Sequence, residues 1–194
     1  MGESSARPLR ADAERSVRAI LEAAERVLSE DPGASMEQIA AAAGVARTTI
    51  HRRFAHRQAL VDALALSAAR RLAQAVDDGR PDTAPPSVAL HRITANVLEV
   101  KGAWTFALGV PTAPGSEAAA IHQEMAGHCL TVLERARAEG LIDASADLHW
   151  VRRVYYALLG ESLHGDADDT GVDTDTLAAR VVDTLLHGAG PRRA

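Results

Sequence analysis

A chain of 194 residues, 47% of them hydrophobic, is long enough to bury one small module and one larger core. We find no apolar run of membrane-spanning length and expect no secretory signal, and a single cysteine excludes an internal disulfide. The net charge of −5 is uneven: residues 1–80 carry 12 basic and 11 acidic side chains, and residues 81–194 carry 9 and 15. These features predict a cytoplasmic protein without membrane contact, and the acidic C-terminal part does not exclude a polyanion partner for the N-terminal part.

The chain is predicted to be all-helical, because apolar residues recur at helical spacing and no alternating segment is present. The predicted helices cover residues 12–29, 57–77, 88–101, 104–110, 116–139, 147–164 and 174–187, and two more lie within residues 35–60, one on each side of Gly44. The segment 79–87 holds three prolines and is the natural domain boundary.

Residues 35–60 predict a helix, a glycine turn and a second helix that is rich in arginine. Ser35 and Gln38 have the spacing of a capping box, and Gly44 can take the positive φ that ends a helix. Ile50 and Phe54 supply apolar contacts that would hold the second helix against the first. This is a helix-turn-helix, which presents one helix to the major groove of DNA.

The charge of this segment supports the same interpretation. No acidic residue lies between Glu37 and Asp62, whereas four arginines do. A surface of one sign favours a polyanion such as double-stranded DNA over a plain soluble hairpin. The predicted DNA-binding residues are Arg47, Thr48, Thr49, His51, Arg52, Arg53 and Arg57.

Position on the helix separates their roles. Arg47 and Thr48 open the second helix and are best placed to touch base edges, whereas the others are candidates for phosphates. For Thr49, an ordinary place on the helix surface is as good an explanation as a phosphate contact.

Residues 10–60 resemble the DNA-binding domain of the TetR (tetracycline repressor) family of bacterial regulators. The resemblance rests on the IAxxAGV element within Gln38–Val45, on Thr49 and Phe54, and on Ala59-Leu60 at the start of a fourth helix. It implies about nine helices, with a three-helix DNA-binding domain over residues 1–56. A connecting helix over 57–78 and a ligand-binding and dimerisation domain over 79–194 would follow.

The chain departs from the usual family pattern at several positions of this motif. Ala46 cannot cap the recognition helix, His51 replaces a tyrosine, Arg53 replaces a histidine, Ala55 a proline and Arg57 a lysine. We expect DNA affinity to depend more on backbone electrostatics than in typical members.

The helices at 147–164 and 174–187 are apolar over more than one face, which indicates burial against a second surface besides their own domain. In the resembled family this pair forms a four-helix bundle with a second subunit, although an ordinary interior pair would show the same pattern. The predicted interface residues of a homodimer are Leu158, Leu159, Leu163, Val181, Val182 and Leu185.

The resemblance also implies a cavity for a small molecule among the helices after residue 88. Candidate lining residues are Trp104, Phe106, His122, Met125, Cys129 and Tyr155, for each of which core packing is the alternative. Trp150 and Tyr156 fit core, interface or pocket equally well.

We expect no metal, no cofactor and no enzyme. His122, His128 and Cys129 share a helix without a third convincing ligand, and the common catalytic motifs are missing. The predicted function is a sequence-specific repressor released from a palindromic operator by a small apolar molecule. The alternative is a DNA-binding protein of the same fold without such a switch, acting architecturally or through a protein partner.

Overall fold

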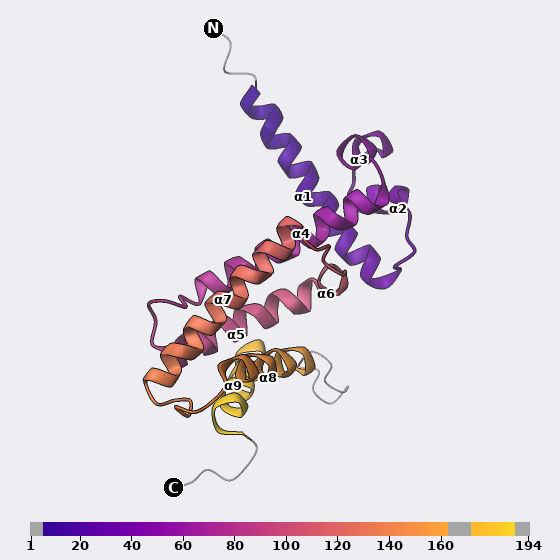
Figure 1. The fold of residues 1–194 in the computed structure, drawn as a ribbon. Helices are drawn as coiled ribbons and strands as arrows, with labels where there is room; N and C mark the ends of the chain where they lie inside the picture. The colour runs from indigo at the N-terminus through magenta and orange to yellow at the C-terminus, as the bar shows by residue number, and fades with distance from the viewer. Residues whose placement is uncertain (1–5, 163–171, 189–194) are drawn as a thin grey trace. The chain divides into compact units, whose positions relative to one another are not determined.

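The computed structural model describes residues 6–162 and 172–188, with side chains from residue 12 onward, and the secondary structure of this part consists of helices joined by turns and loops. Its helices are α1 (Ala6–Glu30), α2 (Met36–Ala42), α3 (Arg47–Arg53), α4 (Arg57–Asp78), α5 (Pro86–Ala103), α6 (Thr105–Gly109), α7 (Glu117–Ala138), α8 (Leu148–Glu161) and α9 (Thr174–His187) (Figure 1). The described residues contain no strand, and the predicted all-α fold with nine helices is confirmed.

Most helix boundaries agree with the prediction to within two or three residues. The largest difference is α1, which begins at Ala6 rather than at residue 12. Pro8 lies in its first turn, where the missing N–H of proline costs no helical hydrogen bond. At its other end α8 stops at Glu161, and the predicted interface residue Leu163 lies outside the described residues.

The chain folds into two compact units that are not continuous in sequence. Unit 1 combines the chain up to Ala68 with Trp104–Thr112, and unit 2 combines Ala69–Ala103 with the chain from Ala113 onward. The short helix α6 therefore belongs with the N-terminal helices, although the chain reaches it only after α5.

Unit 1 is built on α1, which packs against α2 and α6, while α2 packs against α3. Its core consists of fully buried aliphatic side chains, among them Ile20, Leu28, Ile39 and Ile50. One charged group is buried with them: the Glu25 carboxylate, which is 5% exposed.

Glu25 fixes the first turn of α6 onto α1. Its Oε1 accepts a hydrogen bond from the backbone N–H of Phe106 at 2.7 Å, and its Oε2 accepts one from that of Ala107 at 2.9 Å. The hydroxyl of Ser29 also donates to Oε1, at 3.1 Å. Because the first N–H groups of a helix have no partner inside the helix, a carboxylate is well suited to this place.

Unit 2 is built on α5, which packs against α7 and α9, and α8 packs against both of these helices. The turn after α4 lies close to α5, since a Cβ added at Gly79 would stand 2.3 Å from Ile93 Cγ1. Arg135 of α7 holds the loop between α4 and α5 by donating hydrogen bonds to the carbonyl oxygens of Pro81 and Ala84.

Candidate DNA-binding surface and ligand cavity

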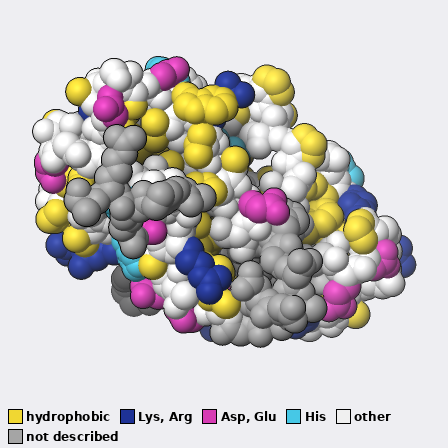
Figure 2. Space-filling model, turned by 90° about the horizontal axis from the view of Figure 1, so that it is seen from below, with side chains coloured by type: hydrophobic (Ala, Val, Ile, Leu, Met, Phe, Trp, Pro, Cys, Tyr) yellow, Lys and Arg dark blue, Asp and Glu magenta, His cyan; other side chains and the backbone are white. Residues whose placement is uncertain are grey.

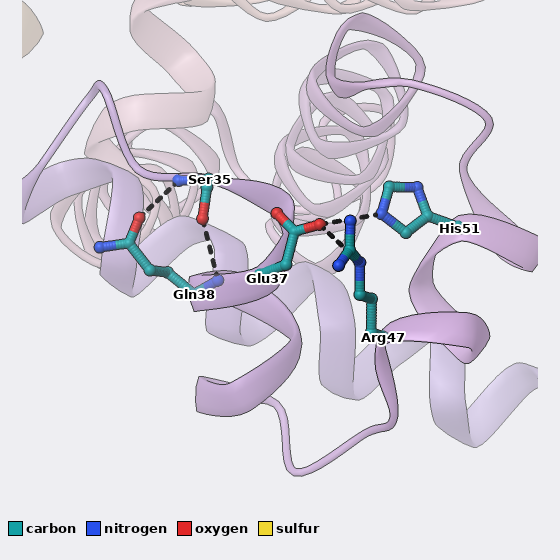
Figure 3. Close-up of polar contacts among 5 residues, drawn as sticks. All are labelled: Ser35, Glu37, Gln38, Arg47 and His51. Carbon is teal, nitrogen blue, oxygen red and sulfur yellow. Dashed lines mark hydrogen bonds and ion pairs between the residues drawn. The ribbon is translucent and has the colours of Figure 1, made fainter.

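The helix-turn-helix contains the capping box and the glycine turn that the sequence predicts. The Ser35 hydroxyl accepts from the Gln38 N–H at 3.2 Å, and the Gln38 side chain accepts from the Ser35 N–H at 2.7 Å, which completes the capping box (Figure 3). Gly44 follows α2 with a φ of 67°, in the left-handed region that glycine reaches without strain. These two features set the start and the end of α2.

The recognition helix α3 is held by its apolar side and begins without a side-chain cap. Ile50 is fully buried and Phe54, where the helix ends, is 7% exposed. Ala46 at the N-cap makes no side-chain hydrogen bond, as its chemistry requires. The position of α3 therefore depends on packing and on the backbone.

The polar side of α3 carries the side chains predicted to meet DNA, except Arg57, which begins α4. Arg47, Thr48, His51 and Arg52 are exposed, whereas Thr49, Arg53 and Arg57 are partly buried. Within the described part of the chain, the Nε of Arg53 is buried and has no hydrogen-bond partner. Arg57 donates to the carbonyl oxygen of Pro32 and so ties the start of α4 to the loop after α1.

Glu37, in the first turn of α2, interacts with side chains of this surface, although it was not among the predicted site residues. Its Oε1 lies 2.9 Å from Arg47 Nε and 3.3 Å from His51 Nε2, so that both side chains point at one carboxylate (Figure 3). Its pKa is lowered by a hydrogen bond from its own backbone N–H, then by His51 and by the charge of Arg47. Glu37 is thus ionised at neutral pH and occupies two of the predicted DNA contacts.

We expect the Glu37→Gln variant to bind DNA more tightly than the natural chain, by about three- to tenfold at low salt. The change removes a negative charge beside the DNA-facing helix and releases Arg47 for a phosphate or a base. The slope of log affinity against log salt should steepen by about one unit, as for one added cationic contact. Fluorescence anisotropy across a salt series measures both quantities.

The control for this variant is Glu30→Gln, which removes the same charge from an exposed position at the end of α1. An equal gain in the two variants would mean that only the overall charge matters. An unchanged affinity for Glu37→Gln would show that the ion pair with Arg47 does not compete with DNA.

Unit 2 encloses a cavity of about 260 Å³ whose wall is almost entirely apolar. The lining residues are Leu72 and Val76 of α4, Leu90, Ile93, Val97 and Lys101 of α5, Met125, Cys129 and Val132 of α7, and Tyr155, Tyr156 and Leu159 of α8. The few polar groups are largely satisfied. The Thr94 hydroxyl donates to the Leu90 carbonyl oxygen at 2.6 Å and therefore accepts from the Tyr155 hydroxyl, at 2.7 Å.

Burial keeps the thiol and the two phenol groups of this wall neutral. It raises the pKa of the Cys129 thiol to about 11 and that of Tyr156 to about 12, and it raises the pKa of Tyr155 as well. At neutral pH Cys129 is therefore a thiol and not a reactive thiolate.

Of the six predicted pocket residues, the structure brings three to the cavity: Met125, Cys129 and Tyr155. Trp104 and Phe106 do not line it, because α6 packs in unit 1, where Glu25 binds its first turn. His122 does not line it either, because it lies on the exposed side of α7.

The sequence analysis missed Lys101, although a signal was present. Leu90, Ile93, Val97 and Lys101 follow one another at spacings of three or four and so share one face of a helix. Three of these side chains are aliphatic, and the fourth is the only lysine among the 21 lysine and arginine residues.

The predicted interface residues on α8 and α9 differ in exposure. Leu159, Val181 and Val182 are buried within the chain, and Leu159 lines the cavity, whereas Leu158 and Leu185 are partly exposed. Two large side chains of α8 are more exposed than any of these, Trp150 at 56% and Tyr156 at 44%. The face in Figure 2 shows exposed hydrophobic side chains among scattered charges.

Two further properties concern the described residues only. None of their helices combines the length and the apolar character that crossing a membrane requires. They also contain no group of three or more His, Cys, Asp and Glu side chains that could hold a metal ion.

Together, the helix-turn-helix of unit 1 and the apolar cavity of unit 2 define a class of protein, the DNA-binding transcriptional regulators. Residues 20–64 match the family described as bacterial regulatory proteins, tetR family. Over 176 residues, 90% of each chain, the sequence is 34% identical to the HTH-type transcriptional repressor LfrR of Mycolicibacterium smegmatis. The chain therefore belongs to the TetR family.

Solved structures agree with this assignment. The crystal structure of the TetR-like regulator LfrR in complex with proflavine matches with a TM-score of 0.69 and 27% identity, covering 92% of this chain and 99% of that one. The regulator PfmR from Thermus thermophilus matches in fold, with a TM-score of 0.76 and 17% identity, covering 89% and 99%. The predicted family is confirmed, and with it the predicted class of function, that of a transcriptional regulator and not an enzyme.

Proposed function

We propose that the protein represses transcription as a homodimer on a palindromic operator in the cytoplasm, and that a small apolar molecule in the unit 2 cavity releases it. The observation that carries this proposal is the presence, in one chain, of an exposed arginine-rich α3 and an apolar cavity. The ligand shifts the equilibrium because it binds the conformation that does not fit DNA more tightly than the one that does.

The DNA contacts divide by position on α3 and at the start of α4. Arg47 and Thr48 stand at its exposed start, where side chains of a recognition helix reach base edges, and an arginine there is suited to guanine. Thr49, His51, Arg52, Arg53 and Arg57 bind phosphates, which position the protein without reading sequence. In this scheme residues 1–56 read the DNA, residues 57–78 connect, and residues 79–194 bind the ligand and form the dimer.

The homodimer contact lies on the outer side of α8 and α9. Exposed Trp150 and Tyr156, with the partly exposed Leu158 and Leu185, supply apolar area there. Leu159, Val181 and Val182 support these helices from inside the chain. Two copies related by a twofold axis would present two α3 helices to half-sites on one side of the DNA.

The ligand-responsive half of the proposal is supported by the kind of wall the cavity has. Aromatic and aliphatic side chains with few polar groups suit a small apolar molecule. The related regulator LfrR has been crystallised in complex with proflavine, so a relative with the same fold holds a small molecule.

Selection of bound duplexes from a random DNA pool near physiological salt tests the proposal. We expect the natural protein to enrich an inverted repeat. Arg47→Ala should relax the preference for particular bases. Arg53→Ala should lose a similar amount of affinity on all sequences, and the slope of log affinity against log salt should be about one unit flatter. Binding without any enriched sequence would instead support the architectural alternative, and an unchanged preferred sequence in Arg47→Ala would remove this residue from base readout.

A further inference from the structure

The cavity of unit 2 has one formally charged group in its wall, and that group is a cation. Lys101 lies in the last turn of α5, on the same face as Ile93 and Val97, and none of the lining residues is acidic. The remaining polar groups of the wall, on Cys129 and the two tyrosines, are uncharged at neutral pH.

Lys101 is half-buried, and among the residues that the structure describes none forms a hydrogen bond or an ion pair with its ammonium group. Its pKa is lowered by burial alone. A cation in such a place loses hydration without gaining the attraction of a nearby anion. An anionic ligand would supply the opposite charge.

A second cation, Arg152 on α8, adds to the positive electrostatic potential at the opposite side of the cavity. The charge of Arg152 on α8 acts on both Cys129 and Tyr156, whose pKa values it lowers against the effect of burial. Arg152 also lies over the Tyr156 ring, with its Cζ 6.0 Å from the ring centroid. An organic cation in this cavity would therefore be repelled by Lys101 in the wall and by Arg152 behind it, and none of the lining residues offers a carboxylate.

We propose that the ligand of this cavity is a small monocarboxylate with an apolar body, whose carboxylate pairs with Lys101 while the body fills the space between α4, α5, α7 and α8. This inference rests on the proposed function, since it names the chemical class of the molecule that acts there. The cavity volume of about 260 Å³ is near the lower end for ligand pockets, and it suits a single short chain or ring system.

The probes that test this inference are decanoate, decanol and decylamine, which share an apolar body and differ in the charge of the head. We expect the natural protein, without DNA, to bind decanoate about tenfold more tightly than decanol, and decylamine most weakly. In Lys101→Met, a change that keeps the volume, the preference for decanoate should disappear while decanol binds as before. Lys101→Arg should retain it.

The control is Arg92→Met, which removes a cation from an exposed position on the same helix and should leave the preference intact. Equal binding of decanoate and decanol to the natural protein, or a preference that survives in Lys101→Met, would overturn the inference.

The single lysine allows a direct readout besides affinity. Reductive methylation with ¹³C-formaldehyde labels Lys101 and the terminal amine, whose pKa near 8 separates the two NMR signals. Decanoate should raise the pKa of Lys101, and decanol should not. A Lys101 pKa that both probes leave unchanged would mean that the ammonium serves only the C-terminal end of α5 and would overturn the inference.

Adding the same probes to the protein bound to operator DNA separates the two proposals. Decanoate that pairs with Lys101 but leaves operator DNA bound would contradict the ligand switch and support the ligand class. A neutral apolar molecule that binds better than decanoate and releases the DNA would support the ligand switch and contradict the ligand class.

Discussion

The Glu25→Ala variant is expected to unfold with a free energy about 2–4 kcal/mol lower than that of the natural chain. The carboxylate is buried and accepts hydrogen bonds from the backbone of Phe106 and Ala107 and from Ser29. Removing it leaves two N–H groups at the start of α6 without an acceptor, and the Ala107 group is buried. Urea denaturation gives the free energy, and amide hydrogen exchange over residues 105–109 should show loss of protection there first.

Two further variants sharpen this test. Glu25→Gln keeps one acceptor oxygen but places an NH₂ group opposite the second N–H, so we expect an intermediate loss of stability. Glu14→Ala removes an exposed carboxylate from the same helix and should change the free energy by less than about 0.5 kcal/mol. Unchanged protection of α6 in Glu25→Ala would show that packing alone holds this helix.

The Trp150→Glu variant is expected to be a monomer and to bind operator DNA at least about 100-fold more weakly than the natural protein. A buried carboxylate at the proposed α8–α9 contact would lack a partner, and each monomer would bind a single half-site without the gain from linkage. Trp150 is exposed in the single chain, and its contact with Arg153 is a surface contact, so the fold itself should tolerate the change. Analytical ultracentrifugation and anisotropy on the selected inverted repeat measure the two effects.

His149→Glu is the matched control, because it introduces the same charge at the adjacent exposed position of α8. A dimer that persists in Trp150→Glu with full operator affinity would move the interface to another surface. Loss of the dimer in both variants would show that charge anywhere on this helix is sufficient.

Much of the DNA-binding surface could be predicted, because the signals that form it are local. The Ser35–Gln38 capping box, the turn at Gly44 and the missing cap at Ala46 each depend on residues within a few positions of one another. The effect of Glu37 on Arg47 and His51 was missed, since it depends on how α2 and α3 cross and not on either helix alone.

The cavity was predicted less completely, for a physical reason that α6 illustrates. Periodicity shows that Trp104 and Phe106 have an apolar surface to bury, but it does not show against which helix. Glu25 binds the amide of Phe106 across 81 positions of the chain, and no local pattern announces such a pairing. Lys101 was within reach of the sequence, because its face of α5 was already defined by aliphatic neighbours.

Because unit 1 is formed by two separate stretches of the chain, chimeric regulators cannot be built with a single cut. Hybrids that join the DNA reader of one protein to the sensor of another are naturally cut after the first helices, near residue 68 in this chain. Such a cut would pair Glu25 with a foreign α6, or with none, and leave a carboxylate without its backbone donors. A transplantable reader must therefore include Trp104–Thr112 as a second insert, and the matching of these two stretches decides which sensors it can accept.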